Sequence, residues 1–194
     1  IESVDYIIHI GDLEKYFVDK DDLDLDTLLI NSQNIKSLLD LSAKSNAKFL
    51  LVSTINVYED ADPLKLSTSY INDNIVNSNI FKTTDARKFA EAVVWEHSRR
   101  FGTNVRVVRI PFVYGPEMNL DACGSLGEML RDLLHRRDIT IYGDGMQTRS
   151  FCYVDDLIDA MMRMMESRSD FTGPVNIGNP GEFTMRELAE MVLD

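Results

Sequence analysis

The sequence predicts an α/β fold in which a parallel sheet carries helices on both faces. Short apolar runs alternate along the chain with longer segments of helical periodicity, the pattern of repeated strand–helix units. The strand-like runs are almost continuously apolar, as expected for strands that are buried on both sides. With 194 residues the chain is long enough to bury a substantial core.

Five segments are predicted as strands because they are short, rich in β-branched residues and bounded by turn-forming residues. They are 5–10, 48–54, 105–115, 139–142 and 175–177. Ligands in folds of this class bind at the carboxyl ends of parallel strands. Thr54, Phe112–Gly115 and Asn176–Asn179 are therefore the first places at which to look for a site.

Five segments are predicted as helices because apolar residues recur three and four positions apart. They are 25–45, 85–101, 124–137, 154–167 and a final helix from 184. The Met-rich stretch 160–167 is predicted as core filler, which is the common role of methionine at helical spacing. An acid-rich surface segment at 12–24 and a long polar loop at 59–84 complete the chain.

The net charge of −12 argues against a nucleic-acid surface, because phosphate backbones require clustered lysine and arginine. No run reaches about 18 apolar residues, so no membrane partner or span is expected. Cys123 and Cys152 lack the spacing of a metal site, and no metal is predicted. Two separate cysteines fit a reducing compartment, which favours a cytoplasmic location.

The stretch IYGDGMQTRSFCYVDDL, residues 141–157, is the most distinctive in the chain. Its two glycines allow a tight turn, and a planar guanidinium such as that of Arg149 binds phosphate through two hydrogen bonds. Tyr142 has a ring that can stack on a base. From residue types alone, a phosphate ligand and a surface arginine that caps the next segment remain equally good interpretations of Arg149.

Several segments together resemble one family. DYIIHIGD is similar to its V-x-H-L-A-A strand, FLLVSTINVYED to F-x-S-T-S-E-V-Y-G-D, and VRVVRIPFVYGPEM to R-I-x-N-x-Y-G-P-R-M. INSQNIKSLLDLS resembles V-N-x-x-G-T-x-N-L-L, and the 141–157 stretch resembles the segment that contacts a substrate diphosphate. The chain thus resembles the NAD-dependent epimerase/dehydratase family of extended short-chain dehydrogenases, most of all its UDP-glucuronate decarboxylase (UDP-xylose synthase) branch.

The resemblance implies a Rossmann-like domain at 1–115 that lacks the first strands, followed by a nucleotide-sugar-binding region at 116–194. It implies a UDP-sugar as the small-molecule partner. The residues at its substrate positions are Tyr142, Arg149, Asn179 and Phe112, the last in place of an asparagine. The residues at its cofactor positions are His9, Asn31 and Arg87.

The catalytic positions depart from the family pattern. Thr54 is retained, but the Glu two residues later is Asn56 here. The family uses Tyr-x-x-x-Lys, in which the lysine lowers the pKa of a tyrosine that exchanges a proton with the substrate. Thr83 and Arg87 stand at these two positions. A threonine hydroxyl has no useful acidity near neutral pH, so the expected catalytic set is degenerate.

The Gly-rich turn that binds NAD in this family is absent from the sequence, which begins where the family has its fourth strand. The resemblance therefore implies NAD only if an upstream Gly-rich half exists, and no cofactor for this chain alone. Two interpretations stay open. The chain is an NAD-dependent nucleotide-sugar enzyme completed by upstream sequence, or it is a non-catalytic relative that binds a nucleotide sugar or serves as an assembly subunit.

The resemblance also implies a homodimer or heterodimer, because the helices matching 25–45 and 85–101 form a four-helix bundle across a two-fold axis in this family. Val94 and Trp95 lie on the apolar side of the second helix. They are interpreted either as dimer contacts or as core residues.

Overall fold

The computed structural model describes residues 3–11, 25–58, 83–121 and 123–193. The acid-rich segment predicted at 12–24 lies outside these ranges. Of the polar loop predicted at 59–84, residues 59–82 also lie outside them. Among the described residues, no helix is both long and apolar enough to cross a membrane.

The chain forms two compact units that interleave along the sequence. Unit 1 comprises residues 1–110 and 160–177, and unit 2 comprises residues 111–159 and 178–194. The boundary expected after residue 115 lies inside unit 2, close to its start. Each unit has its own strand pairing and its own apolar cluster.

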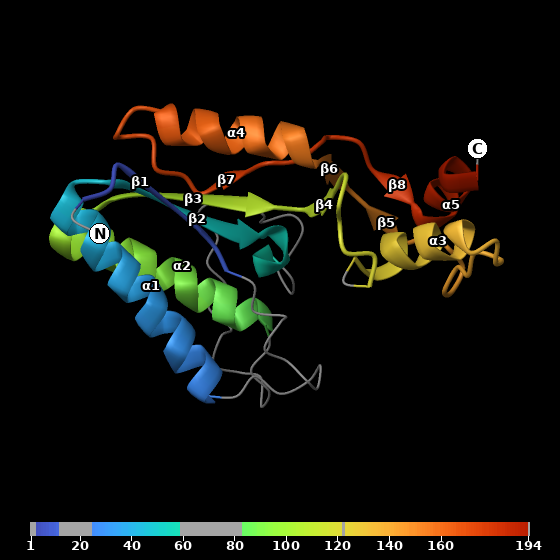
Figure 1. Ribbon diagram of the computed structural model, residues 1–194, viewed down its shortest axis with the longest axis horizontal. Coiled ribbons are helices and arrows are strands. Elements are labelled where there is room, and N and C mark those ends of the chain that lie inside the picture. Colours follow the sequence, from blue (N-terminus) through green and yellow to red (C-terminus); the bar gives the residue numbers. More distant parts are fainter. Residues whose placement is uncertain (1–2, 12–24, 59–82, 122, 194) are drawn as a thin grey trace. The chain divides into compact units, whose positions relative to one another are not determined.

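Unit 1 contains a four-stranded parallel sheet in the order β1-β2-β3-β7 (Figure 1). Its strands are β1 (Tyr6–Ile10), β2 (Lys48–Thr54), β3 (Asn104–Ile110) and β7 (Val175–Asn176). The register aligns the carboxyl ends of β2 and β3, with Thr54 opposite Ile110. The predicted α/β class with a parallel sheet is confirmed.

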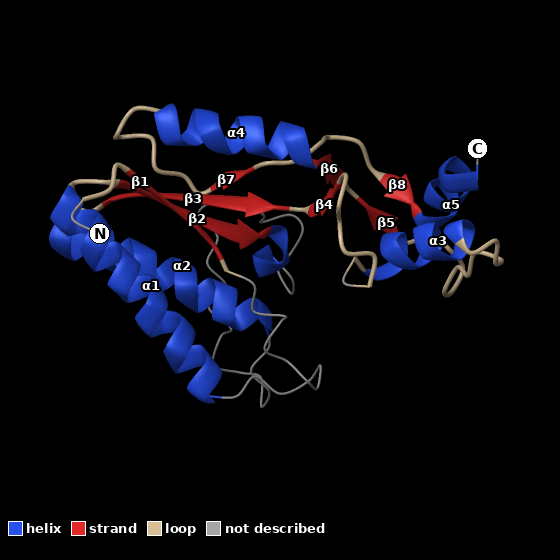
Figure 2. Ribbon diagram, in the orientation of Figure 1, coloured by secondary structure: helices blue, strands red, loops and turns tan. Residues whose placement is uncertain are grey.

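Helices cover both faces of this sheet. Figure 2 shows α1 (Leu25–Ser45) and α2 (Thr83–Phe101) on one face and α4 (Val154–Glu166) on the other. Leu39, Phe49 and Val94 are fully buried in the core between α1, α2 and the sheet, and Trp95 packs against that core. Val94 is therefore a core residue. In α4, the methionines at 161, 164 and 165 are buried as predicted, whereas Met162 is half exposed.

Unit 2 is built from two short strand pairs and two helices. The strands β4 (Phe112–Tyr114) and β6 (Phe151–Tyr153) pair in parallel, and β5 (Thr148–Arg149) and β8 (Phe183–Thr184) pair antiparallel. The helices α3 (Gly124–Leu134) and α5 (Met185–Leu193) share one apolar cluster that includes Met129 and Phe151.

Three predicted elements need correction. The segment 139–142 is not a strand, because Ile139 and Ile141 pack against the α3–α5 cluster without a ladder partner. The predicted strand 105–115 is divided into β3 and β4 at Pro111, which lacks the N–H that a continuous ladder needs. The helix predicted at 124–137 ends at Leu134, and the φ angle of 56° at Arg136 takes the chain out of helical geometry.

Two cations from the sheet bind the carboxyl end of α4. Arg106 is fully buried on β3, and its Nε donates to the carbonyl of Met164 at 2.8 Å. Its Nη2 donates to the carbonyl of Ser167 at 3.1 Å and to that of Arg168 at 3.0 Å. Burial holds the pKa of Arg106 below its ordinary value. Lys48 donates to the carbonyl of Met165 at 2.7 Å. The positive charges face the negative end of the helix dipole.

Candidate functional site

The carboxyl edge of the unit 1 sheet carries Thr54, at the end of β2. The following residues form a short 3-10 helix, Ile55–Tyr58, and the Thr54 Oγ1 accepts a hydrogen bond from the backbone N–H of Asn56 at 3.2 Å. The neighbouring Ser53 is buried, and its Oγ has no hydrogen-bond partner. Thr54 thus lies at the strand end where a ligand is expected.

A polar network lies beside this strand end, and its Arg109 and Glu91 are buried. Arg109 on β3 forms two hydrogen bonds with Glu91 on α2, Nη2 to Oε2 at 2.7 Å and Nε to Oε1 at 3.0 Å. Its Nη1 donates to the Tyr58 hydroxyl at 2.7 Å, and that hydroxyl donates to Oδ1 of Asn176 at 3.1 Å. Burial opposes the charge of Arg109, but the hydrogen bonds and charge of Glu91 keep its pKa above the ordinary value.

This network connects the ends of three strands, because Tyr58 follows β2, Arg109 lies on β3 and Asn176 ends β7. The sequence analysis missed it. A signal was present: Arg106 and Arg109 interrupt an otherwise apolar strand, and their odd spacing places them on opposite faces of the sheet. A charged residue inside a strand buried on both sides requires a partner on each face.

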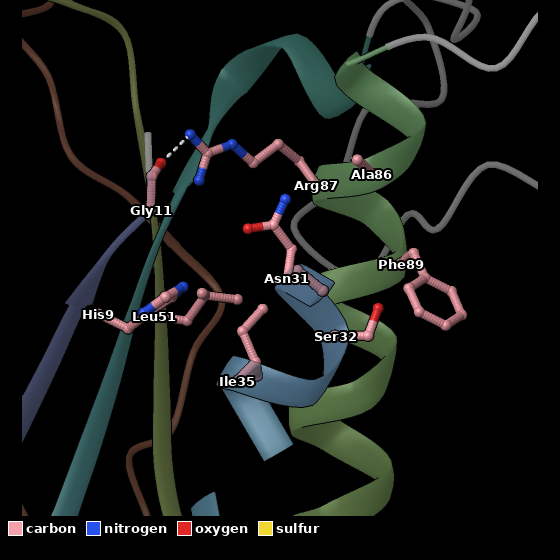
Figure 3. A pocket seen from close by; sticks show the side chains of 10 residues that line it. His9, Gly11, Asn31, Ser32, Ile35, Leu51, Ala86, Arg87 and Phe89 are labelled. Atoms are coloured by element: carbon pink, nitrogen blue, oxygen red, sulfur yellow. Dashed lines mark hydrogen bonds between the residues drawn. The ribbon is translucent and has the colours of Figure 1, made fainter. Parts of the chain in front are cut away.

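A second cluster surrounds the carboxyl end of β1, and it contains the three predicted cofactor residues (Figure 3). His9 extends from β1, Asn31 from α1 and Arg87 from α2, and all three line one small cavity. Arg87 donates from Nη2 to the carbonyl of Gly11. The Nδ2 of Asn31 is buried and has no hydrogen-bond partner among the described residues. The structure therefore brings the predicted cofactor set together.

The electrostatics of this cluster depend on Arg87. Burial and, to a smaller degree, the positive charge of Arg87 lower the pKa of His9 below its ordinary value. The imidazole lies nearly parallel to the ring of Phe49, with 6.4 Å between ring centroids. The lowered pKa favours the neutral form of the His9 ring.

The cavity between His9, Asn31 and Arg87 is small. Its volume is about 20 Å³, enough for about one water molecule. The Gly11 carbonyl already accepts from Arg87, which leaves the Asn31 amide as the unsatisfied group.

The position expected for the catalytic tyrosine is at the start of α2. Thr83 is the first residue of that helix, and its side chain lies outside the described residues. Arg87 follows one turn later, at the position expected for the lysine. The next residue, Lys88, is buried. The described part of this helix therefore presents an arginine where the family pattern has a lysine.

In unit 2, Arg149 lies on β5, directly opposite Phe183 on β8. It is exposed, and its one hydrogen bond within the described residues joins Nη1 to the neighbouring carbonyl of Thr148 at 3.2 Å. It forms no ion pair with a described carboxylate, in contrast to Arg131 and Arg137 on the same unit, which pair with Asp121 and Asp132.

The Gly-Asp-Gly turn before Arg149 has the expected geometry. Gly143 and Gly145 have φ angles of 74° and 73°, which glycine adopts without strain. Asp144 accepts a hydrogen bond from the N–H of Met146 at 3.0 Å, and the carbonyl of Gly145 accepts one from Arg186 at 3.1 Å. The start of α5 thus anchors the turn.

The other predicted substrate residues also lie in unit 2. Tyr142 is 62% exposed, and Phe112 contacts Phe151 edge to face, with 6.1 Å between centroids. Asn179 accepts a hydrogen bond from the N–H of Gly181 at 2.8 Å, which leaves its amide protons available. Among the described residues, no hydrogen bond or ring contact joins Arg149, Tyr142, Phe112 and Asn179 to one another. The structure places them on one unit and does not bring them into contact.

The described residues contain no group of three or more His, Cys, Asp or Glu side chains placed to hold a metal ion. Cys123 and Cys152 are both free thiols. Burial, with a smaller contribution from Asp156, raises the pKa of Cys152, which makes its thiol unreactive.

The parallel sheet with helices on both faces defines a Rossmann-like α/β protein. The family model for the NAD dependent epimerase/dehydratase family matches residues 1–178. The chain belongs to this family, which confirms the resemblance inferred from its motifs.

Curated relatives include UDP-glucuronic acid decarboxylase 5 of Arabidopsis thaliana, 39% identical over 167 residues that cover 86% of this chain and 48% of the relative. UDP-glucuronic acid decarboxylase 1 of Xenopus tropicalis is 30% identical and is covered over 39% of its length. The chain spans less than half of these relatives. The likeness to the decarboxylase branch is confirmed.

Solved structures support the fold. UDP-N-acetylglucosamine 4-epimerase from Methanobrevibacter ruminantium, in complex with UDP-N-acetylmuramic acid, matches with a TM-score of 0.77 at 21% sequence identity. The match covers 96% of this chain and 59% of the epimerase chain. The dTDP-glucose 4,6-dehydratase from Bacillus anthracis, in complex with NAD, matches with a TM-score of 0.76 at 22% sequence identity. The match covers 98% of this chain and 56% of the dehydratase chain.

Proposed function

We propose that this chain binds a nucleoside-diphosphate sugar through unit 2 and performs no hydride chemistry with the residues it contains. Arg149 carries the proposal. A guanidinium that is exposed, anchored on a strand and bonded to one backbone carbonyl retains donors for a diphosphate. The curated relatives are named for UDP-glucuronic acid and several solved neighbours hold UDP-sugars, so a UDP-sugar is the ligand class we propose.

The proposal of absent catalysis is supported by the start of α2. Threonine at the tyrosine position supplies no phenol, and the lysine position is an arginine whose Nη2 binds the carbonyl of Gly11. An NAD-dependent decarboxylase, completed by a Gly-rich half, is the competing proposal. Incubation of the chain, completed by an upstream Gly-rich half, with UDP-glucuronate and NAD decides between them. We expect no release of CO₂ and no UDP-xylose, and formation of either would overturn the non-catalytic proposal.

Arg149→Ala is expected to weaken the binding of UDP by about 1–3 kcal/mol, because hydrogen bonds to a charged group are lost. Isothermal titration with UDP measures the change. Arg168→Ala serves as the control: it removes the same charge from an arginine that pairs with Asp170 in unit 1, and it is expected to leave UDP affinity unchanged. Equal affinity of wild type and Arg149→Ala would exclude Arg149 as the diphosphate ligand.

We also propose that α1 and α2 pair with a second copy or an active relative. Three exposed apolar side chains on these helices support this: Leu29 on α1, and Phe89 and Phe101 on α2. Sedimentation of the purified chain tests the homodimer, and a monomer at all concentrations would exclude it. The two free thiols support a reducing compartment, for which we propose the cytoplasm.

A further inference from the structure

Four aromatic side chains lie on one face of the paired strands β4 and β6 of unit 2 (Figure 1). The register places Phe112 opposite Phe151 and Tyr114 opposite Tyr153. Because side chains alternate along a strand, these four residues share a face, and we call them the aromatic platform. The ring centroid of Phe151 lies 6.1 Å from that of Phe112 and 6.5 Å from that of Tyr114. The centroids of Tyr114 and Tyr153 are 5.5 Å apart.

The aromatic platform is anchored in the core and is partly open to solvent. Phe151 is buried and belongs to the apolar cluster of α3 and α5. Phe112 and Tyr114 are each 40% exposed, although both contact Phe151. The core therefore holds one ring in place, and that ring supports two others that a ligand can reach. Exposed aromatic rings with a fixed backing suit a flat group that is apolar on its faces.

The aromatic platform lies close to Arg149 along the same stretch of chain. Arg149 precedes Phe151 by two residues, so their Cα atoms are at most about 7 Å apart. Phe112 lies opposite Phe151 on the neighbouring strand, about 5 Å away. The Cα atoms of Arg149 and Phe112 are therefore at most about 12 Å apart. A nucleotide sugar carries its sugar ring directly on the diphosphate, so one ligand is long enough to contact both residues.

A polar side chain lies near the start of β4. Gly178 packs against the ring of Pro111, because a Cβ atom placed on Gly178 would lie 3.0 Å from Cγ of that proline. Asn179 is the next residue, and its side-chain oxygen accepts from the N–H of Gly181. Its amide can donate to a hydroxyl. Aromatic rings with a hydrogen-bond donor beside them match a sugar, which has C–H groups on its faces and hydroxyls around its rim.

The two strands of the aromatic platform present no charge to a ligand. Neither Phe112–Tyr114 nor Phe151–Tyr153 contains an acidic or basic residue. Arg149 is the one arginine or lysine within two residues of either strand, and the diphosphate engages it in the proposed complex. The faces of aromatic rings are electronegative, and the exposed Glu117 follows β4 by three residues. A carboxylate on the sugar would lie beside these rings without a cation on either strand to pair with.

We propose that Phe112 and Tyr114 form the sugar subsite of unit 2 and select an uncharged sugar ring over a sugar acid. The inference rests on the proposed function, because Arg149 holds the diphosphate to which the sugar is attached. The half-exposed rings pack against the C–H groups of a pentose or hexose. Phe112 is central to this selection, since the family pattern has at its position an asparagine, which would offer an amide in place of a ring.

UDP-xylose and UDP-glucuronate test the selection, because they differ only in the carboxylate. Isothermal titration of the chain with each is expected to give UDP-xylose about tenfold higher affinity, since the carboxylate is desolvated without a partner. Phe112→Ala is expected to weaken the binding of UDP-xylose about tenfold, the effect of losing roughly 50 Å² of apolar contact. The same variant is expected to bind UDP, which has no sugar beyond the diphosphate, as wild type does.

Phe171→Ala is the matched control, because it removes an exposed phenylalanine of unit 1 and is expected to leave all three affinities unchanged. If Phe112→Ala does not fold, Phe112→Leu decides, since it keeps an apolar side chain and removes the ring; weaker binding of UDP-xylose is again expected. Wild type that binds no UDP would contradict the proposed function and this inference with it. If UDP binds, equal affinity of wild type and variant for UDP-xylose excludes the sugar subsite alone, and UDP-glucuronate that binds as tightly as UDP-xylose excludes the selection.

Discussion

Glu91→Ala is expected to lower the free energy of unfolding by about 3–5 kcal/mol, the usual cost of removing one partner from a buried ion pair. Glu91 and Arg109 have side chains that are 4% and 2% exposed, and two hydrogen bonds join them. Without the carboxylate, the buried guanidinium loses two charge-assisted hydrogen bonds. Urea denaturation followed by circular dichroism measures the loss.

Two further variants make this result interpretable. Glu96→Ala removes an exposed glutamate of the same helix, whose hydrogen bonds to Arg99 and Arg100 lower its pKa to about 2. Because exposed ion pairs contribute little to stability, this control should unfold almost as wild type does. The double variant Glu91→Leu, Arg109→Met removes both charges and should recover much of the lost stability. A Glu91→Ala protein as stable as the Glu96→Ala control would contradict the buried pair.

The consequence for the site is local. Arg109 also donates to the Tyr58 hydroxyl, and its guanidinium carbon lies 4.9 Å from the centroid of the Tyr58 ring. Tyr58 closes the 3-10 helix that begins directly after Thr54. We therefore expect Glu91→Ala to loosen the strand end that carries Thr54, even though neither Glu91 nor Arg109 was among the predicted site residues.

The sheet of unit 1 was predictable because its strands are continuously apolar, and β1 and β2 lie within a residue of the segments expected for them. The strands β5 and β8 were not predictable in the same way. Each has two residues, which is too short for an alternating pattern to register. At 139–142 a strand was predicted where the structure has none. Ile139 and Ile141 alternate as in a strand because both pack against the same core cluster.

Side-chain partners were harder to predict than elements. The motif comparison placed His9, Asn31 and Arg87 in one set, and the structure brings them together around one cavity. It did not reveal that Arg87 would bind a backbone carbonyl of its own chain, because that contact depends on how α2 lies against β1. The bond between Tyr58 and Asn176, separated by 118 positions, depends in the same way on the fold.

Arg106→Met is expected to lower the free energy of unfolding by about 2–5 kcal/mol. Methionine preserves the length of the side chain but cannot donate to the carbonyls of Met164, Ser167 and Arg168. Each of these carbonyls keeps a second donor, from Ser167, Lys48 or Phe171. The loss therefore comes from hydrogen bonds to a charged group, which contribute about 1.5–3 kcal/mol each, and from the attraction between the cation and the carboxyl end of α4.

Arg106→Lys separates the two contributions. A lysine keeps the charge at the helix end but lacks the planar fork that serves several carbonyls at once, so an intermediate loss is expected. Lys48, which binds the same helix end from β2, limits the damage in both variants. Because the carbonyls held by Arg106 lie in the segment that leads from α4 to β7, amide exchange in residues 167–174 should accelerate in Arg106→Met more than in Arg106→Lys. Equal exchange in the two variants would show that charge alone, and not the geometry of the guanidinium, holds this segment.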